Sequence, residues 1–196
     1  MIATLFAGAG FSFSSGLNAY LPLLILALAD RVGTAVELDS PYDWISSAGG
    51  LLVLLLVLPL ELVGDKIPRL DHYNDLLHSV LRPLAGAFGF MAIATQDDHL
   101  NAWVAAALGL AIAAAMHSWK MRSRVAITSA TAGLGNPIVS MLEDAVVIVV
   151  AICSAFVPFA NVVAVPLGLA TLRRSYRRMT TGESRVIKVF QPKQRP

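Results

Sequence analysis

Apolar runs separated by short polar stretches make up most of this chain. The runs occupy residues 2–29, 49–63, 76–94, 102–116, 125–152 and 155–172. A helix needs about 20 apolar residues to cross the hydrocarbon core of a bilayer, so the second and fourth runs suffice only if their flanks join them. The pattern predicts an all-α, polytopic membrane protein with about six transmembrane helices.

Two of the runs contain residues that weaken helices. Residues 14–22 read SSGLNAYLP and residues 131–140 read TAGLGNPIVS, each with Gly-Leu shortly before Asn and Pro. Unpaired backbone at membrane depth is tolerated only where it is buried in protein or lines a polar cavity. We therefore expect both segments to be broken or re-entrant. Together with LPLEL at 58–62 and VPLGL at 165–169, they indicate a weak internal repeat, to which chance similarity is an equal alternative.

Composition supports the membrane assignment. Of the 196 residues, 56% are hydrophobic and 14% are charged, and the mean hydropathy is +0.66. Soluble domains carry about 25% charged residues. The single cysteine, Cys153, excludes an intrachain disulfide and a metal site built from several thiolates. The sequence contains no nucleophile elbow, phosphate-binding P-loop, zinc-protease motif or dinucleotide fingerprint.

The polar stretches between the runs differ in charge. The stretches at 30–48 and 96–101 are acidic, whereas the link at 117–124 contains three basic residues. Basic loops stay in the cytoplasm. These charges therefore predict six crossings with both termini cytoplasmic.

The C-terminal end is strongly basic. From position 173 onward, eight Lys and Arg residues stand against one acid, for a net charge of +7, and the preceding residues carry −5. The end lacks the interleaved aromatic residues that stack on bases, so we expect a membrane anchor and no nucleic-acid partner. The predicted domains are a transmembrane helical domain at 1–173 and a basic cytoplasmic tail at 174–196.

Residues 70–87, LDHYNDLLHSVLRPLAGA, place ionisable groups directly before an apolar run. Asp71, Asp75, His78 and Arg82 recur at i, i+4, i+7 and i+11, which puts them on one face of a helix. Ionisable residues within a membrane are costly and usually face a pathway or a partner, so we expect this face to line a polar cavity. The alternative is a solvated cap with a snorkelling arginine.

Other polar residues in apolar sequence could meet this face. The candidate substrate site predicted from the sequence comprises Asn18, Glu61, Asp65, Asp71, Asp75, His78, Arg82, Asn136, Glu143 and Asp144. Arg82 cannot shed its proton and needs either a carboxylate, for which Glu143 or Asp144 is expected, or a bound anion. His117, Lys120 and Arg124 also share a helix face, for which a solvated basic surface is the favoured interpretation.

The residue types are compatible with several chemistries. Carboxylates with an imidazole suit a divalent cation, which Asp71, Asp75 and His78 would hold, and they also suit proton relay. A guanidinium suits a phosphate or a carboxylate. Both signs in one cavity fit an anionic lipid headgroup, and the sequence does not decide among these chemistries.

Three motifs carry a family resemblance. SGLNAYLPLL, DKIPRLDHYNDLLHSVLRPLAGA and TAGLGNPIVSMLED, with the basic last segment, resemble the bacterial membrane family catalogued as domain of unknown function 4126, over about residues 8–178. The resemblance implies a multi-span protein of the bacterial inner membrane. It implies no activity and no catalytic residues.

These features predict a small transporter or flippase-like carrier with a cytoplasm-facing polar cavity, for a cation or an anionic, phosphate-bearing substrate. One alternative is a membrane-embedded, metal-dependent hydrolase of a lipid phosphate, in which a bound water attacks. The other is a non-catalytic scaffold whose acids and bases pair for packing. Whether the chain is an enzyme stays open. The expected partners are the lipid bilayer and a small ion or anionic lipid, and a homo-oligomer is compatible with the sequence.

Overall fold

The computed structural model describes residues 1–33, 36–65, 68–95 and 100–181, with the backbone alone described at 68–75. Every regular element within these ranges is helical, which confirms the all-α class. The elements are α1 (Ile2–Leu17), α2 (Tyr20–Val32), η1 (Tyr42–Ser46), α3 (Ala48–Gly64), α4 (Pro68–Ala94), α5 (Ala102–Thr131), α6 (Asn136–Phe156), η2 (Pro158–Ala160) and α7 (Asn161–Thr180).

The first break predicted from the sequence separates α1 from α2. Asn18 adopts an extended backbone conformation, with φ −144° and ψ 126°, and ends α1. Its side-chain oxygen accepts hydrogen bonds from the backbone N–H groups of Tyr20 and Leu21, at 3.2 and 2.9 Å, in the first turn of α2 where such groups lack helical partners. Pro22 stands in the same turn, where its missing N–H costs little. The local sequence therefore encodes a hinge at Asn18-Ala19.

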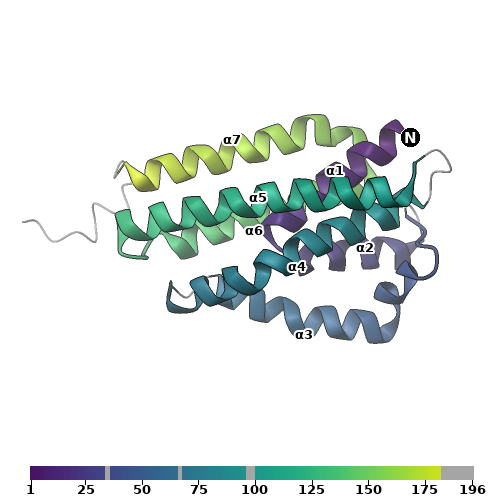
Figure 1. Cartoon of the computed structure of the whole chain (residues 1–196), viewed down its shortest axis with the longest axis horizontal. Helices are drawn as coiled ribbons and strands as arrows, with labels where there is room; N and C mark the ends of the chain where they lie inside the picture. The colour runs from purple at the N-terminus through teal and green to yellow at the C-terminus, as the bar shows by residue number, and fades with distance from the viewer. Residues whose placement is uncertain (34–35, 66–67, 96–99, 182–196) are drawn as a thin grey trace, which may run out of the picture.

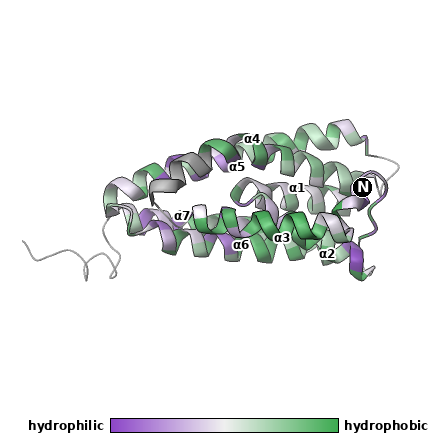
Figure 2. Ribbon diagram, turned by 90° about the horizontal axis from the view of Figure 1, so that it is seen from below, coloured by the Kyte–Doolittle hydropathy of each residue, from purple (hydrophilic) through white to green (hydrophobic). Residues whose placement is uncertain are grey.

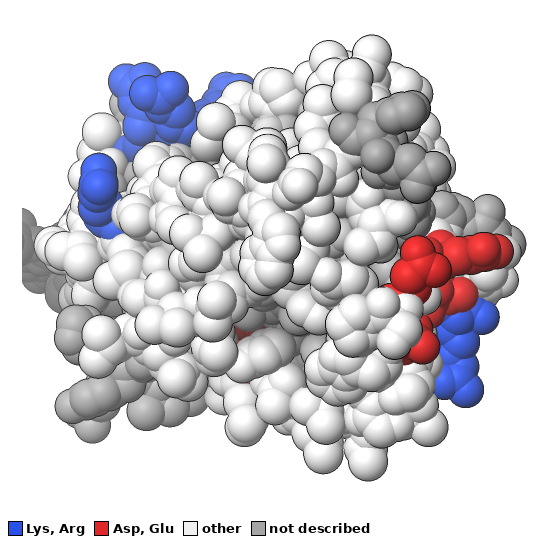
Figure 3. Space-filling view, turned by 45° about the vertical axis from the view of Figure 1, so that its right-hand side comes forward, with Lys and Arg blue, Asp and Glu red and all other residues white. Residues whose placement is uncertain are grey.

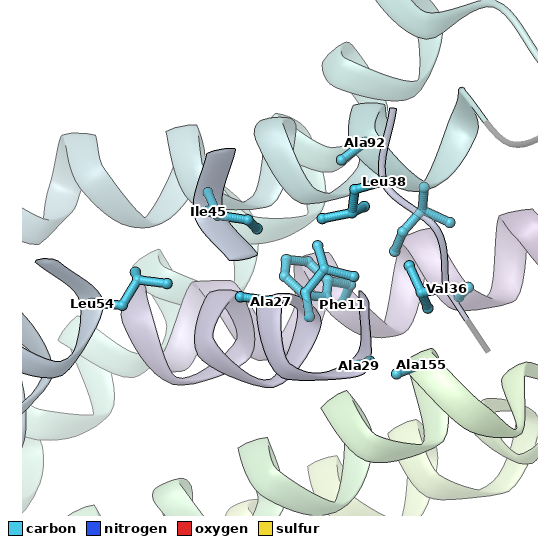
Figure 4. Close-up of a cluster of buried hydrophobic side chains, with 12 residues drawn as sticks. Phe11, Ala27, Ala29, Val36, Leu38, Ile45, Leu54, Ala92 and Ala155 are labelled. Atoms are coloured by element: carbon cyan, nitrogen blue, oxygen red, sulfur yellow. The ribbon is translucent and has the colours of Figure 1, made fainter. Parts of the chain in front are cut away.

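From this hinge α2 runs back toward the end of the bundle where α1 begins (Figure 1, Figure 2). Phe11 of α1 and Ala27 and Ala29 of α2 belong to one buried apolar cluster, which also includes Val36 and Ala155 (Figure 4). The two helices have 16 and 13 residues, against 30 in α5. They form a hairpin of short helices whose hinge lies inside the bundle.

The helices α3 to α7 run lengthwise in alternating directions (Figure 1). The second predicted break is the turn between α5 and α6, where Ala132 and Gly133 have left-handed φ values of 52° and 84°. Residues 131–140 therefore contain the boundary between two helices, and they do not break a single helix within the bundle. Residues 117–124, predicted to be a cytoplasmic link, lie in the middle of α5, which continues unbroken to Thr131. The prediction that these residues link two helices was wrong.

Large apolar side chains cover the outside of the bundle, while many charged ones are buried inside it. Leu56, Leu60, Trp103 and Val163 are among the exposed apolar residues, and Figure 2 shows hydrophobic residues along the length of the helices. An extensive exposed apolar surface marks contact with lipid or with a partner. Within the described residues, three helical stretches are long and apolar enough to cross a membrane: Leu76–Ala94, Ala102–Thr131 and Asn136–Phe156. The chain is a transmembrane protein, and six crossings are not confirmed.

The two ends of the bundle carry different charges. Met1 and the end of α7 lie at opposite ends of the bundle (Figure 1), and the C-terminus itself lies outside the described residues, so the cytoplasmic location of both termini stays a prediction. Figure 3 shows most of the visible acidic side chains gathered at one end and a group of Lys and Arg at the other. Residues 174–180 of the predicted tail continue helix α7, and residues 182–196 lie outside the described part.

A close crossing of α4 and α5 holds the centre of the bundle together. A Cβ atom on Gly109 would lie 2.3 Å from the carbonyl oxygen of Gly86, and one on Gly86 would lie 2.8 Å from that of Gly109. Both neighbours are backbone atoms, which cannot move aside as a side chain can. Small residues at this crossing are therefore required, as at many helix contacts in membranes.

We predict that Gly109→Ala lowers the free energy of unfolding by about 1–3 kcal/mol, because the added methyl overpacks a backbone contact. The measurement is denaturant or thermal unfolding in detergent. Gly49→Ala is the control, since its added Cβ meets only the Ser47 hydroxyl at 3.9 Å. Equal effects of the two changes would contradict the close crossing.

The hairpin also predicts which residues share a membrane face. In a Cys153→Ser background, an impermeant thiol reagent should label Ile2→Cys and Asp43→Cys from the same side and Thr180→Cys from the other. If Ile2→Cys and Thr180→Cys are labelled from the same side, the chain crosses the membrane an even number of times. That result would contradict the hairpin.

Candidate functional site

Six charged side chains are buried together near the hinge. No member of this set is more than 2% exposed. We call it the central ion network; its members are Glu61, Asp65, Arg82, Lys120, Arg124 and Glu143. They come from α4, α5, α6 and the C-terminal end of α3, so the set joins four parts of the chain that are distant in sequence.

Glu61 caps the start of α2. Its carboxylate accepts hydrogen bonds from the backbone N–H of Ala19, at 3.0 and 2.9 Å to its two oxygens, and from that of Tyr20 at 3.3 Å. Arg82 Nε donates to the same carboxylate at 3.1 Å, and His78 Nε2 lies 3.4 Å from it. Backbone N–H groups at a helix start carry partial positive charge and favour an anion. The surroundings of Glu61 are thus those of an anion site, occupied by a carboxylate of the protein itself.

Arg82 joins Glu61 to α5 and to the end of α3. Its Nη2 donates to both carboxylate oxygens of Asp65, at 3.1 and 3.3 Å. Its Nη1 lies 3.0 Å from Nδ1 of His117. Because a guanidinium can only donate, Nδ1 must be the acceptor, and His117 is held as a neutral imidazole. The proton on its Nε2 then points to the Ser79 hydroxyl oxygen at 3.1 Å.

Lys120 caps the end of α1. Its ammonium donates to the carbonyl oxygen of Leu17 at 2.7 Å and to Asp65, and lies 3.4 Å from Glu143. Carbonyl groups at a helix end carry partial negative charge and favour a cation. The two ends that meet at the hinge are therefore capped by side chains of opposite charge, Lys120 on α1 and Glu61 on α2.

Arg124, Glu143 and Tyr176 extend the network toward α7. Arg124 donates to a carboxylate oxygen of Glu143 and, at 2.8 Å, to the backbone carbonyl of Asp65. The Tyr176 hydroxyl donates to the other oxygen of Glu143. The Tyr176 ring stacks on Trp119 with a centroid distance of 4.8 Å, which fixes the position of its hydroxyl.

The central ion network is balanced in charge. Its three acids are Glu61, Asp65 and Glu143, and its three bases are Arg82, Lys120 and Arg124. Removing a charge from water costs several kcal/mol, which an ion pair offsets only when its geometry is good and the remaining polar atoms are hydrogen-bonded. Each acid of the network makes at least one ion pair with one of its bases, so the charges of the six side chains offset one another.

The structure brings together five of the ten residues predicted for the site: Glu61, Asp65, His78, Arg82 and Glu143. Asn18 and Asp144 lie at the edge, where Asn18 Nδ2 donates to the half-buried Asp144 carboxylate at 3.4 Å. Asn136 lies apart, at the start of α6, and donates to the Thr128 hydroxyl at 2.9 Å. The side chains of Asp71 and Asp75 lie outside the described residues.

Of the two carboxylates predicted as partners of Arg82, Glu143 and Asp144, the first lies in a separate group of contacts. Arg82 binds Glu61 and Asp65, whereas Glu143 binds Arg124, Lys120 and Tyr176. The interpretation of Lys120 and Arg124 as a solvated face was also wrong, because both are buried. Their helical spacing from His117 was the sequence signal that could have placed them in the site.

The predicted metal site gains no support in the described part of the chain. There, no three His, Cys, Asp or Glu side chains gather closely enough to hold a metal ion. Of the three proposed ligands, only His78 has a described side chain, and it lies next to Glu61 and against the ring of Tyr20.

We predict that Arg82→Gln lowers the free energy of unfolding by about 3–5 kcal/mol, because it leaves the buried Glu61 carboxylate without its guanidinium partner and the network with a net negative charge. Adding Glu61→Gln should recover part of that loss, with a coupling of about 1–3 kcal/mol, since the glutamine oxygen can still accept from α2. Adding Glu143→Gln should recover less. Unfolding of all variants in detergent measures the cycles, and a larger coupling to Glu143 than to Glu61 would contradict the contacts described.

Comparison with known proteins shows the family of the chain and leaves its activity open. No curated protein and no solved structure matches the chain. One family model matches residues 5–178, a range that includes the hinge and every member of the central ion network. The chain therefore belongs to the family described as Domain of unknown function (DUF4126).

Proposed function

We propose that the protein is a membrane carrier for an anionic substrate, such as one bearing a phosphate, and that this substrate binds at the start of α2 in exchange for the Glu61 carboxylate. The observation that carries the proposal is the set of donors around Glu61. Two backbone N–H groups and a guanidinium donate to one carboxylate, and an imidazole nitrogen lies 3.4 Å from it.

This set of donors is typical of anion sites in proteins. Backbone N–H groups at a helix start bind phosphates and carboxylates, and arginine adds a planar pair of donors. A side-chain carboxylate in such a site satisfies the donors while no substrate is present. The Glu61 carboxylate can also move out of this site, because Glu61 belongs to α3 whereas the backbone donors belong to the start of α2.

The hinge provides the element that can move. We propose that the α1–α2 hairpin is re-entrant, entering the membrane from the acidic end of the bundle, and that α3 to α7 cross it. Helices interrupted near the middle of a membrane expose backbone groups that bind substrates in many carriers. Hinges of a few residues between helices absorb the dihedral changes of opening and closing.

We place the basic end of the bundle in the bacterial cytoplasm. It carries Arg173, Arg174, Arg177 and Arg178, whereas the other end carries the acidic loop with Glu37, Asp39 and Asp43. Basic residues near the ends of membrane helices remain cytoplasmic. In this orientation the C-terminal end of α7 is cytoplasmic and Met1 is outside.

The charge balance of the network favours a second candidate, a membrane scaffold without transport. Three acids and three bases, all with partners, could serve only to fix the packing of α3 to α6. The two candidates differ in one respect. A carrier has an anion site that an external anion can enter, whereas a scaffold has none.

We predict that Glu61→Gln makes the anion site easier to occupy, because the external anion no longer competes with a built-in charge. Inorganic phosphate at about ten times its dissociation constant should raise the unfolding temperature of this variant by about 3–6 °C, and that of the unchanged protein by less. Sodium chloride at equal ionic strength should have no such effect. Glu37→Gln, at an exposed acid outside the network, is the control and should match the unchanged protein.

Reconstitution tests transport itself. Proteoliposomes with the unchanged protein should take up labelled phosphate or glycerol phosphate saturably, and Glu61→Gln should slow the uptake. If neither anion stabilises either protein and neither is taken up, the carrier proposal fails and the scaffold is favoured.

A further inference from the structure

A second cluster of positive charge lies outside the central ion network, on the last turns of α7. Arg173, Arg174, Arg177 and Arg178 are all exposed. In the part of the chain that the structure describes, none of their guanidinium groups has an ion pair or a hydrogen bond, in contrast to the three buried bases of the network. The four side chains surround a hollow of about 440 Å³ together with Ala170 and Thr181.

An apolar groove lies between α6 and α7, just before these arginines. It has a volume of about 210 Å³ and is lined almost entirely by apolar side chains, among them Val149, Ala164 and Leu167. The floor is formed where Gly168 meets Val146 so closely that an added Cβ would lie 2.7 Å from the valine side chain. The groove therefore offers an apolar slot on the outer surface of the bundle.

Helical spacing connects the groove to two of the four arginines. Leu167 and Thr171 line the groove, and Arg174 and Arg178 continue the same row one and two turns further along α7. Arg173 and Arg177 follow Ala170 instead, on the adjoining face. A ligand with a charged head and an apolar chain could thus contact Arg174 and Arg178 while its chain lies in the groove.

We propose that this surface of α6 and α7 binds one anionic diacyl phospholipid from the leaflet at the basic end, with its phosphate on Arg174 and Arg178 and an acyl chain in the groove. Guanidinium groups match phosphate oxygens in pairs, and basic clusters beside a membrane helix attract anionic headgroups. A free phosphate would use the arginines and leave the groove empty, whereas a zwitterionic lipid would gain little from four unpaired cations. The inference does not depend on the proposed carrier function, because it involves none of the central ion network.

Native mass spectrometry of the full-length protein tests the headgroup. Phosphatidylglycerol should remain bound as a single copy, and phosphatidylcholine with identical chains should bind at least about tenfold more weakly. Glycerol phosphate, which has the headgroup charge without the chains, should not compete at equal concentration. Equal retention of the two lipids, or effective competition by glycerol phosphate, would overturn the proposal.

Paired variants test which arginines are used. The double change Arg174→Gln with Arg178→Gln should weaken phosphatidylglycerol binding by roughly thirtyfold, if each contact is worth about 1 kcal/mol. Arg173→Gln with Arg177→Gln is the matched control, with the same loss of charge on the adjoining face, and should have a clearly smaller effect. Equal losses would mean general attraction of anionic lipid to α7 and would overturn the placement in the groove.

A neutral change tests the groove itself. Thr171→Phe fills the end of the groove at an exposed position and should reduce lipid retention with no change in charge. Leu169→Phe adds an aromatic ring on another exposed face of α7 and should leave retention unchanged. If Thr171→Phe also leaves retention unchanged, no acyl chain lies in the groove.

Discussion

The capping of the α1–α2 hinge by two side chains of opposite charge is the interaction on which the rest of the structure depends. A helix interrupted inside a membrane protein leaves backbone N–H and C=O groups that lipid cannot satisfy. Glu61 accepts from the first N–H groups of α2, and Lys120 donates to the last carbonyl of α1. Each cap is itself a buried charge and requires a counterion. The other members of the network supply these counterions, Arg82 for Glu61 and Asp65 for Lys120.

The same requirement explains why the interior is polar while the exterior is apolar. Asp65 accepts from both Lys120 and Arg82, so one carboxylate joins the Lys120 cap to the counterion of the Glu61 cap. Arg124 and Glu143 then add one base and one acid, which keeps the total charge at zero and ties α5 to α6. Because the network is neutral as a whole, removing one member leaves an uncompensated charge in the interior. The helices consequently depend on one another through the network as well as through apolar packing.

Much of this arrangement could be predicted from the sequence, but not how the charges pair. The hinge could be predicted because Asn18 and Pro22 act locally, on the ends of their own helices. The prediction for Lys120 and Arg124 was wrong because a short basic stretch has the same composition in a cytoplasmic loop as in a buried helix. Their acid partners belong to other parts of the chain, so the local sequence does not reveal the pairing. The partner of Arg82 was wrongly predicted for the same reason. Helical spacing shows which residues share one face of a helix, but it does not show which other helix that face contacts. Many residues of the site could therefore be predicted, but not their arrangement in space.

The distribution of the caps over different helices also determines how the proposed carrier would move. Of the two hairpin helices, Glu61 near the end of α3 caps α2, whereas Lys120 in the middle of α5 caps α1. An anion that replaces Glu61 at Ala19 and Tyr20 would loosen the contact between α2 and α3 and leave α1 attached to α5. The released Glu61 would still face Arg82, so the network would keep its counterion while α2 becomes free to turn about Asn18. Movement would then be confined to α2 and the acidic loop that follows it, and the long helices would remain in place.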